Sequence, residues 1–124
     1  MATQNGGPGD DIFSGDDADD NFSGNGGNDT LWGSGGNDIL SGGSGNDTIN
    51  DESGVVSING GTDNDIISVG WGQTGTVNGG SGTDALTGGD ISGLTLSGLE
   101  ILLTGGHQMQ AYLVYGTAAQ FEVF

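Results

Sequence analysis

The chain has 124 residues with no Lys, Arg or Cys and 17 Asp plus Glu, so its formal net charge is −17. Without basic side chains to neutralise phosphate, it is not expected to bind nucleic acid or an anionic membrane. No apolar stretch is long enough for membrane insertion, and the lack of Cys excludes disulfides, thiolate zinc sites and thiol nucleophiles. Because 29 residues are Gly and only 31% are hydrophobic, the composition predicts disorder unless a bound cation cancels the charge.

Residues 1–5 are expected to form an N-terminal tail. The first residues have neither a charged leader nor an apolar core, so they are not expected to act as an N-terminal signal peptide. Export, if it occurs, would then use another route.

A nine-residue repeat begins at residue 6. Five nonapeptides follow one another without a gap to residue 50, each with Asp at its sixth position and a large apolar residue at its eighth. The sixth positions are Asp11, Asp20, Asp29, Asp38 and Asp47, and the eighth positions are Phe13, Phe22, Leu31, Leu40 and Ile49.

The frame continues less strictly to residue 87. Val56 and Gly75 stand at the sixth positions of the sixth and eighth repeats, whereas Asp65 and Asp84 restore the carboxylate in the seventh and ninth. Val69 is interpreted as a single-residue insertion between repeats.

The residue types within one repeat predict a turn followed by a short strand. Glycines at the first, second and fourth positions allow a tight backbone path that includes positive φ angles, and the last three residues alternate polar–apolar–polar. Two repeats then close one coil, and successive coils stack their strands in parallel. Carboxylates eighteen residues apart would form columns and repel one another. Calcium, which takes roughly six to eight carboxylate and carbonyl oxygens in flexible geometry, suits such turns better than magnesium.

The repeat resembles the RTX (repeats-in-toxin) nonapeptide G-G-x-G-x-D-x-U-x, and GGSGNDTIN at residues 42–50 matches it in full. The resemblance covers residues 6–87, about two-thirds of the chain. It implies an all-β, right-handed parallel β-roll (a β-solenoid) with calcium between successive turns of one side, and folding after secretion. The metal-binding residues that it implies are Asp11, Asp29, Asp47, Asp65, Asp84, Asp20, Asp38, Gly7, Gly9, Gly24, Gly26, Gly27, Gly33, Gly35, Gly36, Gly43, Gly45, Gly61, Gly80 and Gly82.

Alternate repeats would place their turns on opposite sides of the coil. One side is predicted to hold Asp11, Asp29, Asp47, Asp65 and Asp84. The other is predicted to hold Asp20 and Asp38, followed by Val56 and Gly75, where the ligands fail. Calcium is therefore expected along the whole of one side and only on the N-terminal half of the other, with about five or six ions in all.

Residues 88–124 are predicted to form a hydrophobic C-terminal β cap, because the last coil of a solenoid would otherwise expose its apolar face. Residues 91–103 indicate two short strands around Gly98. The final Glu122-Val123-Phe124 resembles the C-terminal export signal of proteins secreted by the type I route, and it is equally compatible with a terminal strand. Further strands are predicted at residues 111–115 and 120–124.

No nucleophile–base pair, phosphate-binding loop or HExxH motif is present, so the chain is not expected to be an enzyme. The leading hypothesis is an extracellular, secreted calcium-binding structural protein that folds when calcium is present and self-assembles head to tail into filaments or a matrix. The argument is that no hydrophobic cap precedes Gly6, so the first coil would offer its strand edges to another subunit unless residues 1–5 cover them.

Three alternatives stay open. The first is a monomeric, non-catalytic RTX module that assists the folding, secretion or adhesion of a larger protein. The second is ice binding through outward rows of β-branched residues. The third is a disordered Gly/Asp-rich spacer, which is the state expected without calcium.

Overall fold

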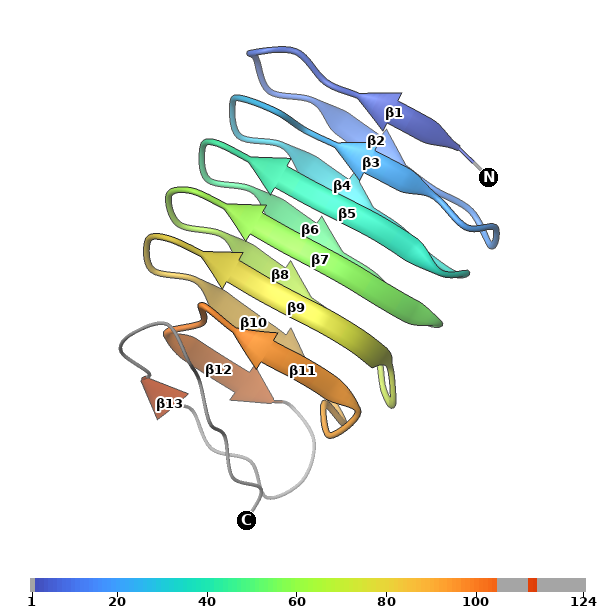
Figure 1. Ribbon diagram of the computed structural model, residues 1–124, viewed down its shortest axis with the longest axis vertical. Coiled ribbons are helices and arrows are strands. Elements are labelled where there is room, and N and C mark those ends of the chain that lie inside the picture. The colour runs from blue at the N-terminus through green and yellow to red at the C-terminus, as the bar shows by residue number, and fades with distance from the viewer. Residues whose placement is uncertain (1, 105–111, 114–124) are drawn as a thin grey trace.

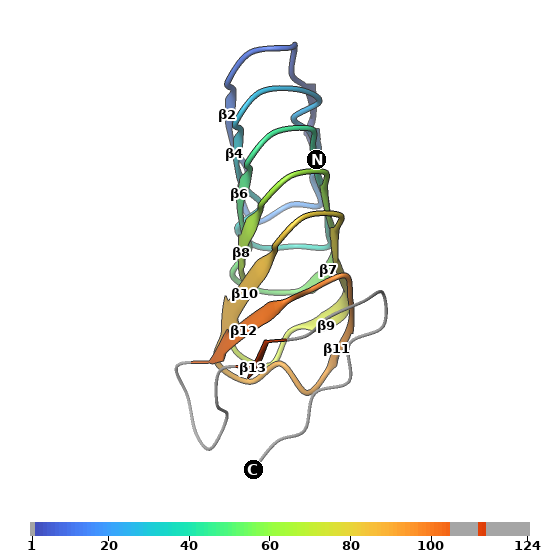
Figure 2. The same ribbon diagram turned by 90° about the vertical axis from the view of Figure 1, so that its left-hand side faces the viewer.

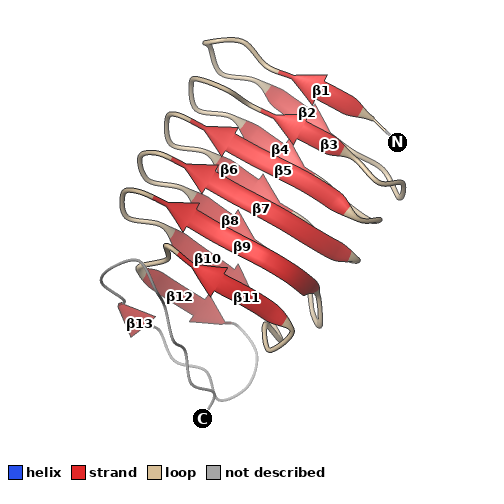
Figure 3. Cartoon of the chain, viewed as in Figure 1, coloured by secondary structure: helices blue, strands red, loops and turns tan. Residues whose placement is uncertain are grey.

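Figure 1 shows the computed structural model, which describes residues 2–104 and 112–113, with side chains to residue 100. Every regular element in this part of the chain is a strand, and none of it is a helix that could cross a membrane. The chain winds into a β-solenoid of about five turns. Its strands alternate between two sheets that form opposite walls of the coil (Figures 2 and 3). The predicted all-β class and parallel solenoid are confirmed.

Two sheets run the length of the solenoid. The odd-numbered strands form the first sheet: β1 (Thr3–Asn5), β3 (Asn21–Ser23), β5 (Asp38–Gly43), β7 (Val55–Gly61), β9 (Thr74–Gly80) and β11 (Leu94–Ser97). The second sheet consists of β2 (Ile12–Ser14), β4 (Thr30–Trp32), β6 (Thr48–Asn50), β8 (Ile66–Ser68), β10 (Ala85–Gly88), β12 (Ile101–Thr104) and β13 (Tyr112–Leu113). The described pairs are parallel except for β12 with β13, which is antiparallel.

The strand register follows the repeat. Thr30 of β4 pairs with Thr48 of β6, which pairs with Ile66 of β8, a step of two nonapeptides per coil. The next step is one residue longer, because Ile66 pairs with Ala85 of β10. The β7–β9 pair lengthens in the same way. One extra residue between β8 and β9 is therefore confirmed. It is not Val69 itself, because the N–H of Val69 donates to the carbonyl oxygen of Thr87 just as that of the first-position Asp51 donates to the carbonyl oxygen of Ser68. Val69 thus takes the first position of its coil, with its side chain buried against the core, and the extra residue follows it.

The core is a single ladder of apolar side chains between the two sheets. Each middle strand contributes one inward eighth-position residue, as expected from the polar–apolar–polar pattern, and β7 contributes Val56 as well. The eighth-position members that are buried are Phe22, Leu31, Leu40, Ile49, Ile58, Ile67, Val77 and Leu86. Phe13 is half-buried at the N-terminal end, with its ring 5.7 Å from that of Phe22. The core is thin because it contains little besides this ladder, so the turns contribute much of what holds adjacent coils together.

Residues 3–5 form the strand β1, although a tail was expected from residues 1–5. The backbone N–H of Asn21 donates to the carbonyl oxygen of Ala2 (2.8 Å), and the N–H of Ala2 donates to Oδ1 of Asp20 (2.8 Å). The reason is that β3 would otherwise leave its outer backbone groups unpaired. Main-chain pairing therefore creates a strand where the sequence has no apolar signal.

The predicted pair of short strands around Gly98 is confirmed as β11 and β12, with Gly98 at a φ of +60° between them. Leu99 is fully buried and Ile91 nearly so, and both extend the core beyond the repeats. Within the predicted 111–115 strand, β13 is present. The predicted 120–124 strand and the export signal lie outside the described residues.

Candidate metal-binding edges

The turns of the solenoid form two edges (Figure 1). We call the turns that lead into β2, β4, β6, β8 and β10 the first edge; they comprise residues 6–10, 24–28, 42–46, 60–64 and 79–83. The second edge comprises the turns that lead into β3, β5, β7 and β9, at residues 15–19, 33–37, 51–54 and 70–73.

A column of carboxylates runs along the first edge. The backbone N–H of Asp29 donates to Oδ1 of Asp47 (2.8 Å), and that of Asp47 donates to Oδ1 of Asp65 (2.8 Å). The same bond, also 2.8 Å, links Asp11 to Asp29 and Asp65 to Asp84. The structure therefore brings together the five aspartates predicted for this side.

The column does not stop at the last repeat. The N–H of Asp84 donates to Oε2 of Glu100 at 2.8 Å. Sequence reasoning missed Glu100, because it lies sixteen residues after Asp84 rather than eighteen or nineteen. On the second edge the corresponding column is shorter: the N–H of Asp20 donates to Oδ1 of Asp38 (2.8 Å), and Val56 and Gly75 follow.

The second carboxylate oxygen has no partner in every aspartate of the two columns except the first of each. Oδ2 is buried and accepts no hydrogen bond in Asp29, Asp38, Asp47, Asp65 and Asp84. At the N-terminal end Oδ2 of Asp11 accepts the N–H of Gly7 (2.9 Å). A buried carboxylate oxygen without a partner carries a large desolvation cost, so each of these oxygens marks a place for a cation.

A backbone carbonyl stands beside each of these oxygens on the first edge. A Cβ atom at Gly42 would strike Oδ2 of Asp47 and would lie 2.6 Å from the carbonyl oxygen of Gly60, one coil further on. A Cβ atom at Gly60 would likewise lie 2.5 Å from Oδ2 of Asp65 and 2.6 Å from the carbonyl oxygen of Gly79. A carboxylate oxygen and a carbonyl oxygen from adjacent coils therefore converge on one glycine.

This donor set fits calcium, which is bound by carboxylate and carbonyl oxygens together. No three acidic or His side chains gather at one point within the described residues. Each coil supplies one carboxylate to a column, so carbonyl oxygens would have to complete the coordination.

The model of the RTX calcium-binding nonapeptide repeat matches residues 5–40, 14–49 and 41–74. Together these matches cover more than half of the chain. The chain belongs to the RTX calcium-binding repeat family. The curated proteins and the solved structures contain no match to it. RTX repeats bind calcium as structural rather than catalytic units, and the chain is a calcium-binding structural module.

The glycines predicted for the RTX turns divide into two groups. Seven have positive φ and occupy second or fourth positions: Gly27, Gly36, Gly43, Gly45, Gly61, Gly80 and Gly82. The others lie outside the left-handed region: Gly7, Gly9, Gly24, Gly26, Gly33 and Gly35. Gly24 and Gly33 hold the first position of their repeats. There glycine is needed because carboxylate or carbonyl oxygens lie too close to leave room for a Cβ atom, not because the backbone has a positive φ.

The prediction included Gly24 and Gly33 of the first-position glycines of the nonapeptide frame but missed six others: Gly6, Gly15, Gly42, Gly60, Gly70 and Gly79. At each of the six except Gly70 a Cβ atom would meet the aspartate of the same RTX turn and a carbonyl oxygen of the next coil. The signal was present, because glycine occupies the first position in eight of the nine repeats.

A second ladder, also missed, runs along the fifth positions of the first edge. The N–H of Asn46 donates to Oδ1 of Asn28 (2.8 Å), and the N–H of Asn64 donates to Oδ1 of Asn46 (2.9 Å). The recurring Asn-Asp dipeptide was the available signal. Because the amide side chains are neutral, this ladder joins the coils without adding charge.

Burial raises the pKa above the ordinary value in five RTX aspartates: Asp29, Asp38, Asp47, Asp65 and Asp84. The pKa rises to about 6 for Asp47, about 7 for Asp65 and about 6 for Asp84, with burial as the largest cause. The hydrogen bond from the preceding coil opposes this rise in Asp47 and Asp65, and neighbouring carboxylates add to it. The chain has no Lys or Arg to offset these charges.

The metal-free chain is therefore expected to gain structure as the pH falls. These groups bind protons more tightly when folded than in the unfolded chain, where the pKa is near 3.8. Their contribution to stability is complete below about pH 3.8 and is lost as the pH rises through about 6 to 7. Circular dichroism of the chain in chelator should show more β signal at pH 4.5 than at pH 7.5. An equal or weaker signal at pH 4.5 would contradict the expectation that protonation of these carboxylates stabilises the metal-free fold.

Proposed function

We propose that the chain is a secreted structural protein that is largely unfolded without calcium and folds as the ions bind between successive turns. About five or six ions are expected, most of them on the first edge. When bound, calcium supplies the positive charge that the chain lacks. Folding and metal binding are then one equilibrium, as in other small domains whose sites do not exist in the unfolded chain.

The observation that carries this proposal is the repetition of buried, unpartnered carboxylate oxygens in a chain without Lys or Arg. A single such atom could be a local defect. Four of them recur in successive turns of the first edge, at Asp29, Asp47, Asp65 and Asp84, and a fifth lies at Asp38 on the second edge. The chain has no Lys or Arg that could neutralise this series of charges.

The two oxygens of each aspartate have different tasks in this proposal. Oδ1 of Asp47 accepts the N–H of Asp29 and so fixes the distance between two coils. Oδ2 of Asp47 would bind the ion together with carbonyl oxygens such as that of Gly60, which lies beside it at Gly42. The absence of a side chain at Gly42 keeps the space between these atoms open.

A calcium titration tests calcium-dependent folding. The β signal in circular dichroism is expected to appear as calcium reaches the millimolar range, to stay weak with the same concentration of magnesium, and to disappear with chelator. Calorimetry should give about five or six ions per chain. A chain that is equally folded in chelator and in calcium at pH 7.5 would contradict the proposal.

Secretion and self-assembly are further parts of the proposal. RTX repeats are typical of secreted proteins. Within the described residues, β1 and β2 each pair on one side only. The N–H of Gly15 and the carbonyl oxygen of Asp11 both form hydrogen bonds with β4 of the next coil. Because the backbone groups of successive residues in a strand point to opposite sides, the N–H of Ser14 points away from β4, toward the open edge. Strand edges of this kind can pair with another chain.

Light scattering of the calcium form provides the measurement for assembly. The native chain is expected to form particles larger than a monomer, and Ser14→Pro, which removes the outward N–H, should reduce their size, whereas Ser14→Ala should not. A strictly monomeric calcium form would reject assembly and would favour the alternative, a monomeric module that assists a larger protein.

A further inference from the structure

The repeat at residues 51–59 departs from the pattern at three positions. Asp51 and Glu52 replace the first and second glycines, and Val56 replaces the sixth-position aspartate. Val56 is buried in the core, with 1% of its surface exposed. By the nonapeptide pattern alone the second edge therefore loses its ligand at this coil.

Asp51 restores a carboxylate at that place. Its Oδ1 and Oδ2 of Asp38 converge on Gly33, where a Cβ atom would lie 2.5 Å from the former and 2.6 Å from the latter. In the preceding turn of the same edge, a Cβ atom at Gly15 would meet Oδ2 of Asp20 and the carbonyl oxygen of Gly33. The carboxylate of Asp51 thus occupies the place of the carbonyl oxygen in a regular turn.

Both facing oxygens are buried and without a partner. Asp38 is 1% exposed and Asp51 is 3% exposed, and neither Oδ2 of Asp38 nor Oδ1 of Asp51 accepts a hydrogen bond. Two carboxylates in contact with the same glycine repel one another when both are ionised. A cation between them would remove the repulsion and would give both oxygens the partner that they lack.

Gln73 holds Asp51 in this orientation. Its Nε2 donates to Oδ2 of Asp51 at 2.7 Å, and its Oε1 accepts the N–H of Gly70 at 2.6 Å. Gln73 is itself buried, with 2% of its surface exposed. The hydrogen bond from Gln73 therefore fixes Oδ2 of Asp51 and leaves Oδ1 directed toward Asp38. Residues that hydrogen-bond to metal ligands orient those ligands in the same way in known metal sites.

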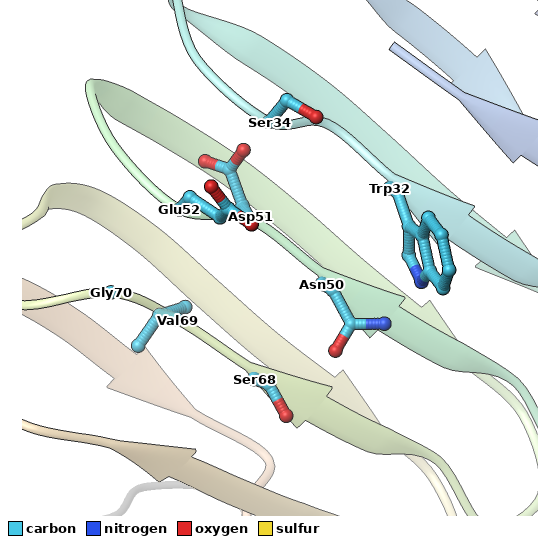
Figure 4. Close-up of a pocket in the computed structure, with 8 residues that line it drawn as sticks. All are labelled: Trp32, Ser34, Asn50, Asp51, Glu52, Ser68, Val69 and Gly70. Carbon is cyan, nitrogen blue, oxygen red and sulfur yellow. The ribbon is translucent and has the colours of Figure 1, made fainter. Parts of the chain in front are cut away.

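A surface groove lies beside Asp51. It has a volume of about 430 Å³, and its lining includes Trp32, Asn50, Asp51, Glu52 and Ser68. Figure 4 shows Asp51 and Glu52 next to each other on one turn, with Trp32 and Asn50 on neighbouring strands. Glu52 is exposed and does not belong to the buried pair of carboxylates.

We propose that Asp38 and Asp51 form an additional calcium site on the second edge, with Gln73 as a positioning residue. This site rests on the proposed calcium-dependent folding but is not part of the nonapeptide pattern, because one of its carboxylates comes from a first position. It extends ion binding on the second edge one coil beyond the last sixth-position aspartate of that edge.

The test compares the number of calcium ions bound by the folded native chain and by Asp51→Asn, measured by equilibrium dialysis. Asp51→Asn is expected to bind one ion fewer, while Glu52→Gln, which removes a neighbouring exposed charge, keeps the native number. An unchanged number in folded Asp51→Asn would overturn the inference and would indicate that the two carboxyl groups share a proton instead. If the native chain neither binds calcium nor responds to it, the proposed function itself fails.

A second variant decides the case in which Asp51→Asn does not fold. Gln73→Ala keeps both carboxylates but releases Asp51, so one ion is expected to bind about 10- to 100-fold more weakly, as for other outer partners of metal ligands. The remaining ions should bind as in the native chain. Native affinity for every ion in Gln73→Ala would overturn the inference.

Discussion

Replacement of Gly42 by alanine is expected to prevent calcium-dependent folding at calcium concentrations that fold the native chain. The added Cβ would strike Oδ2 of Asp47 and would lie 2.6 Å from the carbonyl oxygen of Gly60. The carbonyl cannot move away freely, because it belongs to the adjacent coil. Overpacking alone costs about 1–3 kcal/mol, and the oxygen pair that would bind the ion is also separated. We expect the calcium midpoint in circular dichroism to rise at least about tenfold.

Gly9→Ala is the matched control for this change. Gly9 also lies in a turn of the first edge, but nothing is within 4 Å of a Cβ atom there, and its φ lies outside the left-handed region. Its calcium midpoint should therefore stay close to the native value. Similar midpoints for the two alanine variants would show that close packing at Gly42 is not needed for the metal-bound fold.

Asp47→Asn is expected to have opposite effects on the metal-free and calcium-bound states. The amide oxygen can still accept the N–H that Asp29 donates to Oδ1, so the spacing of the coils is kept. The loss of one buried charge should make the metal-free chain easier to fold at neutral pH, because burial and the neighbouring Asp29 raise the pKa of Asp47 to about 6. The loss of an anionic ligand should raise the calcium midpoint at least about tenfold.

The variant Asp17→Asn is the control that distinguishes the loss of a column carboxylate from the loss of one unit of net charge. Asp17 is exposed and belongs to neither column, so its replacement removes the same charge without removing a ligand. Its calcium midpoint should be nearly native. Equal midpoints in the two variants, measured by the same titration, would mean that net charge rather than the column controls folding.

The sequence predicted what repeats with the nonapeptide. Leu31 and Ile49 are two repeats apart, and this spacing predicted the length of one coil. The core ladder was predicted because side chains alternate between the two faces of a strand, so a three-residue strand has only one inward position. The spacing of Asp29 and Asp47 gave the columns in the same way. Both features depend on residues that recur at fixed intervals, so no knowledge of contacts was needed.

The features that sequence reasoning missed depend on contacts outside the repeat. β1 has no apolar side chain and forms because β3 offers backbone groups to it. Gln73 reaches Asp51 across 22 residues that include the extra residue between β8 and β9, so their contact has no counterpart in other coils. Glu100 replaces an aspartate at a different spacing, and its longer side chain allows it to bind the N–H of Asp84.

The hydrogen bonds of the first-edge column all point the same way along the chain. The N–H of each aspartate is satisfied by a carboxylate that is synthesised later, and the series ends at Glu100. The asparagine ladder of the same edge points the opposite way, because the N–H of Asn46 donates to Asn28 and that of Asn64 donates to Asn46, each in the preceding coil. An inner coil therefore completes its bonding only when both of its neighbours are in place. Stacked repeats can propagate order from a neighbour that is already structured, and the two opposed ladders let the solenoid of this chain grow from any such coil toward either end.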